Sequence, residues 1–361
     1  MRLSWKLGAV MVLVVAAASA PTATRLVPAA VAPQLKSIGP LMFGPGGVLY
    51  AADREAATIF ALDLGAQASS GTSGAVGVEK LDEKIAGMLG TTASAIALTD
   101  LAVNPVSHNA FVSVMRGQGA EAKPALVRID GAGKLDLINF DTVSFTSVAL
   151  PNPAAVSPNG RGGRTQSVTD MALVDGRLVV AGLSNEEFAS KLWSVPYPFT
   201  TTDRGTSVEI YHGNHGQFET RAPVMTFLPY RAANQSMIVA AYTCTPLVKF
   251  SLDALKPGDK VVGHTMMDLG AGNQPIDMIQ YAKGGQNFLL MANSRYGVIK
   301  VPTAQFATAP DITAKVETAG TFEPVAAMTG IEQLDLLDAQ RSAAIARAQD
   351  GSRSLAVTAL P

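Results

Sequence analysis

Short apolar segments recur along this chain, each bounded by glycine, asparagine or other polar residues. One unit has a first strand that opens on an apolar or aspartate position, a tight turn, a more hydrophobic second strand, a polar loop and a third strand. Six second strands align at spacings of about 50 to 70 residues, as repeat architectures do. They cover residues 48–52, 111–115, 178–182, 237–241, 289–293 and 343–347. The third strands follow at residues 58–62, 125–129, 191–195, 247–251, 297–301 and 354–358.

This repetition predicts an all-β fold, a six-bladed β-propeller in which small antiparallel sheets surround an axis. A seventh blade remains open as an alternative. The strands mix small and β-branched residues rather than alternating strictly, as expected where blades stack face to face and bury both surfaces. A pair of β-sandwiches is the competing interpretation, but it does not predict regular repetition.

The ends of the chain suggest how the ring closes. The last copy stops at Pro361, directly after its third strand. The segment Gln34–Ile38 precedes the first copy and could supply the missing outer strand. Closure by this mature N-terminal segment would remove exposed sheet edges, which otherwise favour aggregation.

The first 23 residues read as a secretory signal. Arg2 and Lys6 give a positive start, an apolar stretch runs from Leu7 to Ala18, and small residues suited to cleavage follow. We therefore expect a signal peptide at 1–23, a single propeller domain at 24–361 and a periplasmic or secreted location. The apolar stretch is short for a bilayer span, so no membrane span is expected after cleavage.

Charge and cysteine content narrow the classes of partner. The chain has 28 basic and 29 acidic side chains among 361 residues, which argues against a nucleic-acid binder because no basic excess is present to neutralise phosphates. Its single cysteine excludes a disulfide scaffold. We expect a monomer.

One long connection carries a helical pattern. Within residues 65–99, Val78, Leu81, Ile85 and Leu89 fall on one helical stripe. We expect this segment to cover the axis or to pack on a blade.

Two segments carry a family resemblance. Residues 39–53 (GPLMFGPGGVLYAAD) and 169–180 (TDMALVDGRLVV) resemble the blade consensus of the NHL and SMP-30 (gluconolactonase-like) propellers. The resemblance implies a propeller. For the lactonases of that superfamily it also implies a catalytic calcium ion held at the axis by glutamate, asparagine and aspartate.

Three aspartates occupy equivalent first positions of inner strands. They are Asp100, Asp170 and Asp277. Carboxylates that converge on a narrow channel repel one another unless a hard cation or hydrogen bonds balance them, so calcium is the candidate cofactor. The alternative is that each aspartate only bonds the backbone of its adjoining turn.

A second cluster contains softer metal ligands. His212 and His215 stand three residues apart, and by topology Cys244 lies on a neighbouring loop of the next copy. Imidazole and thiolate ligands suit copper or zinc, with Met225, Met266 or Met267 as candidate axial ligands. The alternative is that the histidines cap loop carbonyls and that Cys244 is a buried hydrophobic residue.

Three functions therefore stay open. The first is a module that binds a protein or small-molecule ligand through the top face, where inner strands begin and the second strand of each blade turns into the third. The second is a calcium-dependent lactonase-like hydrolase with axial aspartate ligands. The third is a copper redox partner using His212, His215 and Cys244. No nucleophile elbow or paired general acid and base stands out, so we expect the first.

Overall fold

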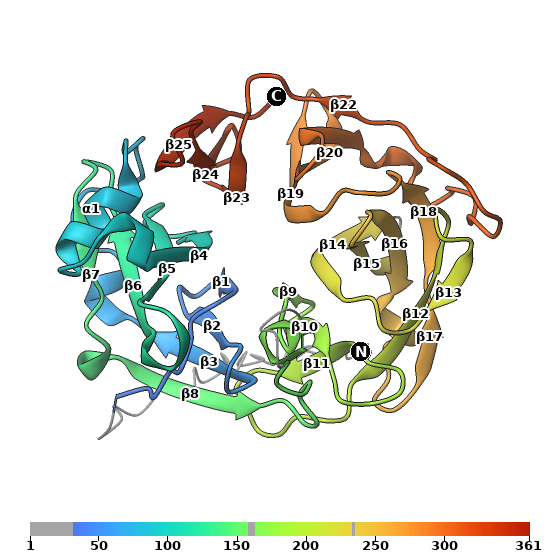
Figure 1. Cartoon of the computed structure of the whole chain (residues 1–361), viewed down its shortest axis with the longest axis horizontal. Coiled ribbons are helices and arrows are strands. Elements are labelled where there is room, and N and C mark those ends of the chain that lie inside the picture. Colours follow the sequence, from blue (N-terminus) through green and yellow to red (C-terminus); the bar gives the residue numbers. More distant parts are fainter. Residues whose placement is uncertain (1–31, 158–162, 233–234) are drawn as a thin grey trace, which may run out of the picture.

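The computed structural model describes residues 32–157, 163–232 and 235–361, and these residues form a ring of six antiparallel sheets (Figure 1). The predicted six-bladed β-propeller is confirmed. The predicted signal peptide at 1–23 lies outside the described residues. Among the residues that are described, no helix is long and apolar enough to cross a membrane.

The blades are numbered in the order of their inner strands along the chain, and their strands are given from the axis outward. Blade 1 contains β1 (Leu41–Phe43), β2 (Leu49–Asp53), β3 (Thr58–Asp63) and β8 (Ser144–Ala149). Blade 2 contains β4 (Ile96–Val103), β5 (Ala110–Arg116), β6 (Lys123–Ile129) and β7 (Leu135–Leu137). Blade 3 contains β9 (Asp170–Val174), β10 (Arg177–Leu183), β11 (Ser190–Pro196), β12 (Thr206–His212) and β13 (Gln217–Glu219).

The other three blades follow the same outward order. Blade 4 contains β14 (Val224–Ala232), β15 (Gln235–Tyr242), β16 (Pro246–Ser251) and β18 (His264–Asp268). Blade 5 contains β19 (Pro275–Lys283), β20 (Gln286–Asn293), β21 (Gly297–Pro302) and β22 (Glu323–Pro324). Blade 6 contains β23 (Ile331–Leu336), β24 (Arg341–Arg347) and β25 (Arg353–Ala359). A further short strand, β17 (Lys260–Val262), pairs in parallel with β12 and so adds to blade 3.

All six predicted second strands and all six predicted third strands fall on observed strands. Face-to-face stacking explains their mixed apolar pattern, as β2 illustrates. Leu49 packs into the apolar cluster between blades 1 and 2, whereas the next residue, Tyr50, packs into the cluster between blades 1 and 3. Since successive side chains of a strand point to opposite faces, a strand buried on both faces has no polar side.

The order of the blades around the ring differs from their order along the chain. Along the chain, β1 to β3 come first and the whole of blade 2 follows. The next strand, β8, then pairs with β3 at the outer edge of blade 1. Blade 1 therefore lies between blades 2 and 3, and blade 2 lies beside blade 6, as the contacts between the inner strands show (Figure 1).

The predicted closure by Gln34–Ile38 is wrong. Backbone N–H groups of Lys36 and Ser37 donate to the buried carboxylate of Asp53, at 2.6 and 3.2 Å, and this anchors the segment on blade 1. The outer edge of blade 6 instead meets Val78, which exchanges two backbone hydrogen bonds with Leu355, at 2.8 and 2.9 Å. Because the hydrogen bonds to Asp53 hold Gln34–Ile38 on blade 1, the segment does not act as the missing strand of blade 6.

The predicted helical stripe packs at this same seam. The helix α1 (Leu81–Met88) buries Leu81 and Ile85 completely in a cluster that also contains Val112 of blade 2 and Ile345 of blade 6. The helix therefore seals the contact between the second and the last blade, which is where the ring closes.

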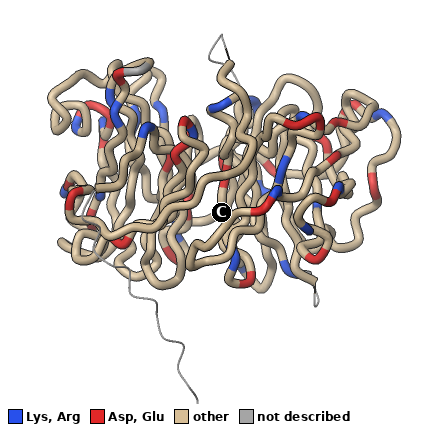
Figure 2. The backbone as a smooth tube through the Cα atoms, turned by 90° about the horizontal axis from the view of Figure 1, so that it is seen from below, with Lys and Arg blue, Asp and Glu red and all other residues tan. Residues whose placement is uncertain are grey.

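Charged residues are interspersed over the molecule. In the edge view, Lys and Arg are interspersed with Asp and Glu over the tube, without an extended area of one sign (Figure 2).

Candidate functional site

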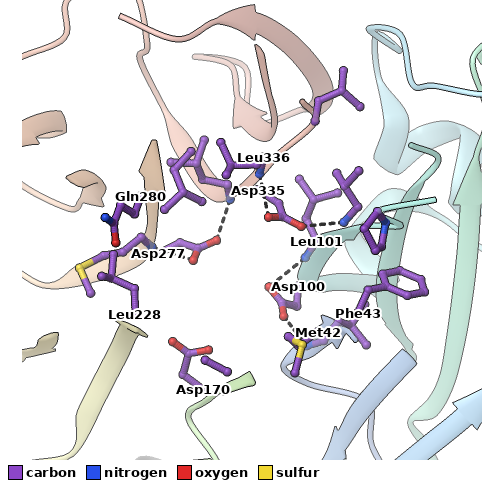
Figure 3. A pocket seen from close by; sticks show the side chains of 18 of the residues that line it. Met42, Phe43, Asp100, Leu101, Asp170, Leu228, Asp277, Gln280, Asp335 and Leu336 are labelled. Carbon is purple, nitrogen blue, oxygen red and sulfur yellow. Dashed lines mark hydrogen bonds between the residues drawn. The ribbon is translucent and has the colours of Figure 1, made fainter. Parts of the chain in front are cut away.

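A cavity of about 540 Å³ lies on the axis, where the inner strands of all six blades meet (Figure 3). Its apolar wall includes Phe43, Leu228 and Leu336. Five aspartates also line it, and four of them stand on the inner strands of four blades: Asp100, Asp170, Asp277 and Asp335. Their carboxyl groups point toward the open centre in Figure 3. A mostly apolar cavity of this size with a few converging polar groups is typical of small-molecule sites.

Each of these aspartates joins two neighbouring blades. One carboxyl oxygen accepts from the backbone N–H of the residue that follows it, at 2.7 to 2.9 Å. The other oxygen accepts from a backbone N–H group on the inner strand of a neighbouring blade. For all four aspartates, that neighbour lies in the same direction around the ring. The acceptor and donor pairs are Asp170 with Phe227, Asp277 with Leu334, Asp335 with Val103, and Asp100 with Leu41, at 2.5 to 2.7 Å.

These bonds explain why the chain places aspartate here. The inner strands leave backbone N–H groups facing the axis, and a buried N–H group without a partner is costly. Blade 4 has Thr226 at the corresponding position, since Thr226 stands opposite Ala241 just as Asp277 stands opposite Ala292. The alternative that each aspartate bonds backbone is therefore correct in part, but the bonds join separate blades as well as the adjoining residue.

The four inner-strand aspartates are half-buried around the axis, in a poorly solvated environment. Burial raises the pKa of Asp100 to about 8, and it raises the pKa of Asp170 and of Asp335 to about 6. Burial also raises the pKa of Asp277, and the charges of Asp100 and Asp170 raise it further. The hydrogen bonds from the backbone oppose this effect without cancelling it.

Asp335 was not among the aspartates predicted from the sequence. It precedes the second strand of its copy by the same number of positions as Asp170 does, so the register of the repeat could have located it. The three predicted aspartates do come together at one cavity, as expected. Whether they bind calcium stays a prediction.

A smaller, polar pocket of about 300 Å³ lies on the other side of the aspartates. Asp100, Asp170 and Asp277 line both cavities, and the smaller one adds Arg54 and Thr99. Its other residues precede or begin the inner strands, so it opens on the predicted top face. The larger cavity lies toward the ends of the inner strands, on the opposite face, where the sequence had not led us to expect a site.

The second predicted cluster also forms. His212 ends β12, His215 lies in the turn before β13, and Cys244 lies between β15 and β16 of the neighbouring blade. One ring nitrogen of each histidine and the Cys244 sulfur lie within 4.8 Å of one another. Among the residues that the structure describes, this is the one group of three candidate metal ligands as close as that, and the axial aspartates do not form such a group.

Glu219 binds both histidines. His212 Nδ1 lies 3.0 Å from one carboxylate oxygen of Glu219, and His215 Nδ1 lies 2.6 Å from the other. The hydrogen bond with His212 is the main cause that lowers the pKa of Glu219 to about 2. A carboxylate can only accept, so both histidines carry their proton on Nδ1.

The candidate methionine ligands lie elsewhere. Met266 and Met267 are buried in an apolar cluster that blade 4 shares with blade 5. Met225 lines the smaller axial pocket.

Comparison with known proteins assigns no chemistry to this chain. No family model and no curated protein matches the chain. Among solved structures, the PQQ-bound aldose sugar dehydrogenase of Streptomyces coelicolor aligns over 91% of this chain and 96% of its own, with 13% identity and a TM-score of 0.35. A putative oxidoreductase (glucose dehydrogenase) of Thermus thermophilus aligns over 91% and 98%, with 12% identity and a TM-score of 0.35.

A glycoside hydrolase is as similar to this chain as these two dehydrogenases are. The GH43B protein of a Bacteroides ovatus xyloglucan locus aligns over 70% of this chain and 50% of its own, with 10% identity and a TM-score of 0.34. Similarity this low does not allow the chemistry of those enzymes to be assigned to this chain. The fold and the site of the chain itself define a six-bladed β-propeller with an axial cavity lined by carboxyl groups.

Proposed function

We propose that this chain is an exported binding protein that takes a small organic cation into its axial cavity. The convergence of carboxyl groups from the inner strands of four blades in a mostly apolar cavity supports the proposal. An ammonium group attached to an apolar body would match both parts of the lining. Export rests on the signal predicted at residues 1–23.

The carboxylate charges in the cavity are costly on their own. Burial and mutual repulsion disfavour the ionised forms of Asp100 and Asp277. A cation among them offsets both effects, and its N–H groups can donate to carboxyl lone pairs that the backbone leaves free. An anion would meet repulsion, and a neutral alcohol would offset no charge.

Three probes that share a butyl chain test this proposal: butylammonium, butanol and pentanoate. At pH 8 we expect butylammonium alone to raise the melting temperature and to give a saturable calorimetric titration. Its affinity should fall at pH 5, because the carboxyl groups whose pKa values are about 6 and 8 then become protonated.

Asp277→Asn provides the test variant, and Asp141→Asn provides the control, because Asp141 is exposed and lies outside the cavity. The first should lose most of the ammonium response, and the second should keep it. Equal responses to all three probes, or none to butylammonium, would contradict the proposal. Stoichiometric binding of calcium that Asp277→Asn abolishes, without ammonium binding, would instead support the calcium prediction.

A further inference from the structure

A second site, away from the axial cavity, lies at the outer seam between blades 3 and 4. It contains His212, His215 and Cys244, whose candidate ligand atoms lie within 4.8 Å of one another. His212 is buried, and the side chain of His215 is 42% exposed. An ion could therefore reach the cluster from solvent and still contact a buried ligand.

The two histidines are already oriented as metal ligands. Glu219 accepts from Nδ1 of both rings, so Nε2 of each ring carries a lone pair and is free to bind an ion. The two rings lie against each other in a tilted arrangement, with centroids 3.8 Å apart and an angle of 33° between their planes. A carboxylate that fixes the tautomer of a histidine from its far side is a recurrent feature of metal sites.

The Nε2 atom of His212 has no hydrogen-bond partner, although the side chain is only 2% exposed. The nearest carboxylate oxygen, Oδ2 of Asp268, is 4.0 Å away, too far for a hydrogen bond. The carboxylate of Asp268 already accepts from the N–H groups of Asn214 and Gly270, both at 2.9 Å. A buried polar atom without a partner is costly, and a bound ion would satisfy it.

We propose that His212, His215 and Cys244 bind a thiophilic transition-metal ion of the copper and zinc class. Two imidazole nitrogens and a thiolate are ligands that such ions prefer, whereas calcium and magnesium require oxygen. Binding would deprotonate the Cys244 thiol and release that proton to solvent. Neither the cavity nor its aspartates take part, so this site and the axial ligand are independent.

Metal-free protein titrated with Co²⁺, a spectroscopic substitute for Zn²⁺, and separately with Cu⁺, tests the proposal. We expect one equivalent of Co²⁺ to produce a thiolate-to-metal charge-transfer band that Zn²⁺ then removes. One equivalent of Cu⁺ should protect Cys244 from alkylation, which reports on a single residue because the chain has one cysteine.

Cys244→Ser and His215→Ala should each lower the metal affinity at least tenfold. The second change is at an exposed side chain, so the fold should persist. His264→Gln is the matched control, since Nε2 of His264 already pairs with the carbonyl of Ala309 at 2.7 Å. The proposal is wrong if no ion binds at one equivalent, or if Cys244→Ser binds as tightly as the unmodified protein.

Discussion

Replacing Ile85 by alanine is expected to lower the free energy of unfolding by about 2 to 5 kcal/mol, because it leaves a cavity in a fully buried position. Ile85 is 0% exposed and packs at the seam where blade 2 meets blade 6. Alanine is the better helix former, so any loss must come from packing rather than from helix propensity. Urea denaturation followed by circular dichroism measures the change.

Met88→Ala on the same helix is the control. Its side chain is 39% exposed, so we expect a change within about 0.5 kcal/mol. The comparison tests whether the helix α1 helps to close the ring. Equal effects of the two substitutions would show that this helix adds nothing to the seam, and that the contacts between the inner strands close the ring alone.

The second large effect is a loss of stability as the pH rises. An ordinary carboxyl group has a pKa of 3.8, whereas in the folded protein burial raises the pKa of Asp170 and Asp335 to about 6 and that of Asp100 to about 8. Between these values the folded chain binds more protons than the unfolded chain, so the free energy of unfolding falls with rising pH. Each unit of pKa difference corresponds to about 1.4 kcal/mol, and we expect a total loss of roughly 2 kcal/mol or more between pH 5 and pH 8.

Urea denaturation at several pH values between 5 and 8 checks this expectation. Asp100→Asn removes a group whose pKa is raised to about 8, so it should flatten the pH dependence between pH 6 and pH 8 even if it lowers the stability at every pH. Asp141→Asn, at an exposed position, should keep the original slope. A stability that rises over this range, or an unchanged slope in Asp100→Asn, would contradict the raised pKa values.

Ligand binding connects this result to the proposed function. A cation in the axial cavity would stabilise the ionised carboxylates and so lower their pKa values. Saturating butylammonium should therefore reduce the loss of stability between pH 5 and pH 8. The pH dependence and the proposed ligand can thus be examined in one set of measurements.

Local patterns in the sequence were sufficient for the strands. The segments 178–182 and 191–195 coincide with β10 and β11, because apolar runs bounded by turn residues depend only on residues close in sequence. The aspartate positions followed from the same register, apart from Asp335. Blade topology predicted the grouping of His212, His215 and Cys244. In a propeller, the fourth strand of each blade ends on the same face as the loop between the second and third strands.

Other features depended on contacts between segments far apart in the chain. From the sequence we expected Gln34–Ile38 to close the ring, but the carboxylate of Asp53 holds that segment on blade 1, and Val78 pairs with Leu355 instead. No local pattern marks blade 2 as an insertion between β3 and β8. The strands of a blade look alike whichever neighbour they pack against, so the sequence does not specify the order of the blades.

The sequence by itself therefore determined the repeat, the strands, the residue types at the axis and the candidate metal ligands His212, His215 and Cys244. The tertiary structure decided which blades are neighbours, and so which backbone N–H group each aspartate accepts from. It also decided that Glu219 orients both histidines and that Nε2 of His212 is buried without a partner. The physical reason is that strand patterns arise from neighbours along the chain, whereas burial, pKa shifts and unpaired atoms arise from the environment that distant segments create.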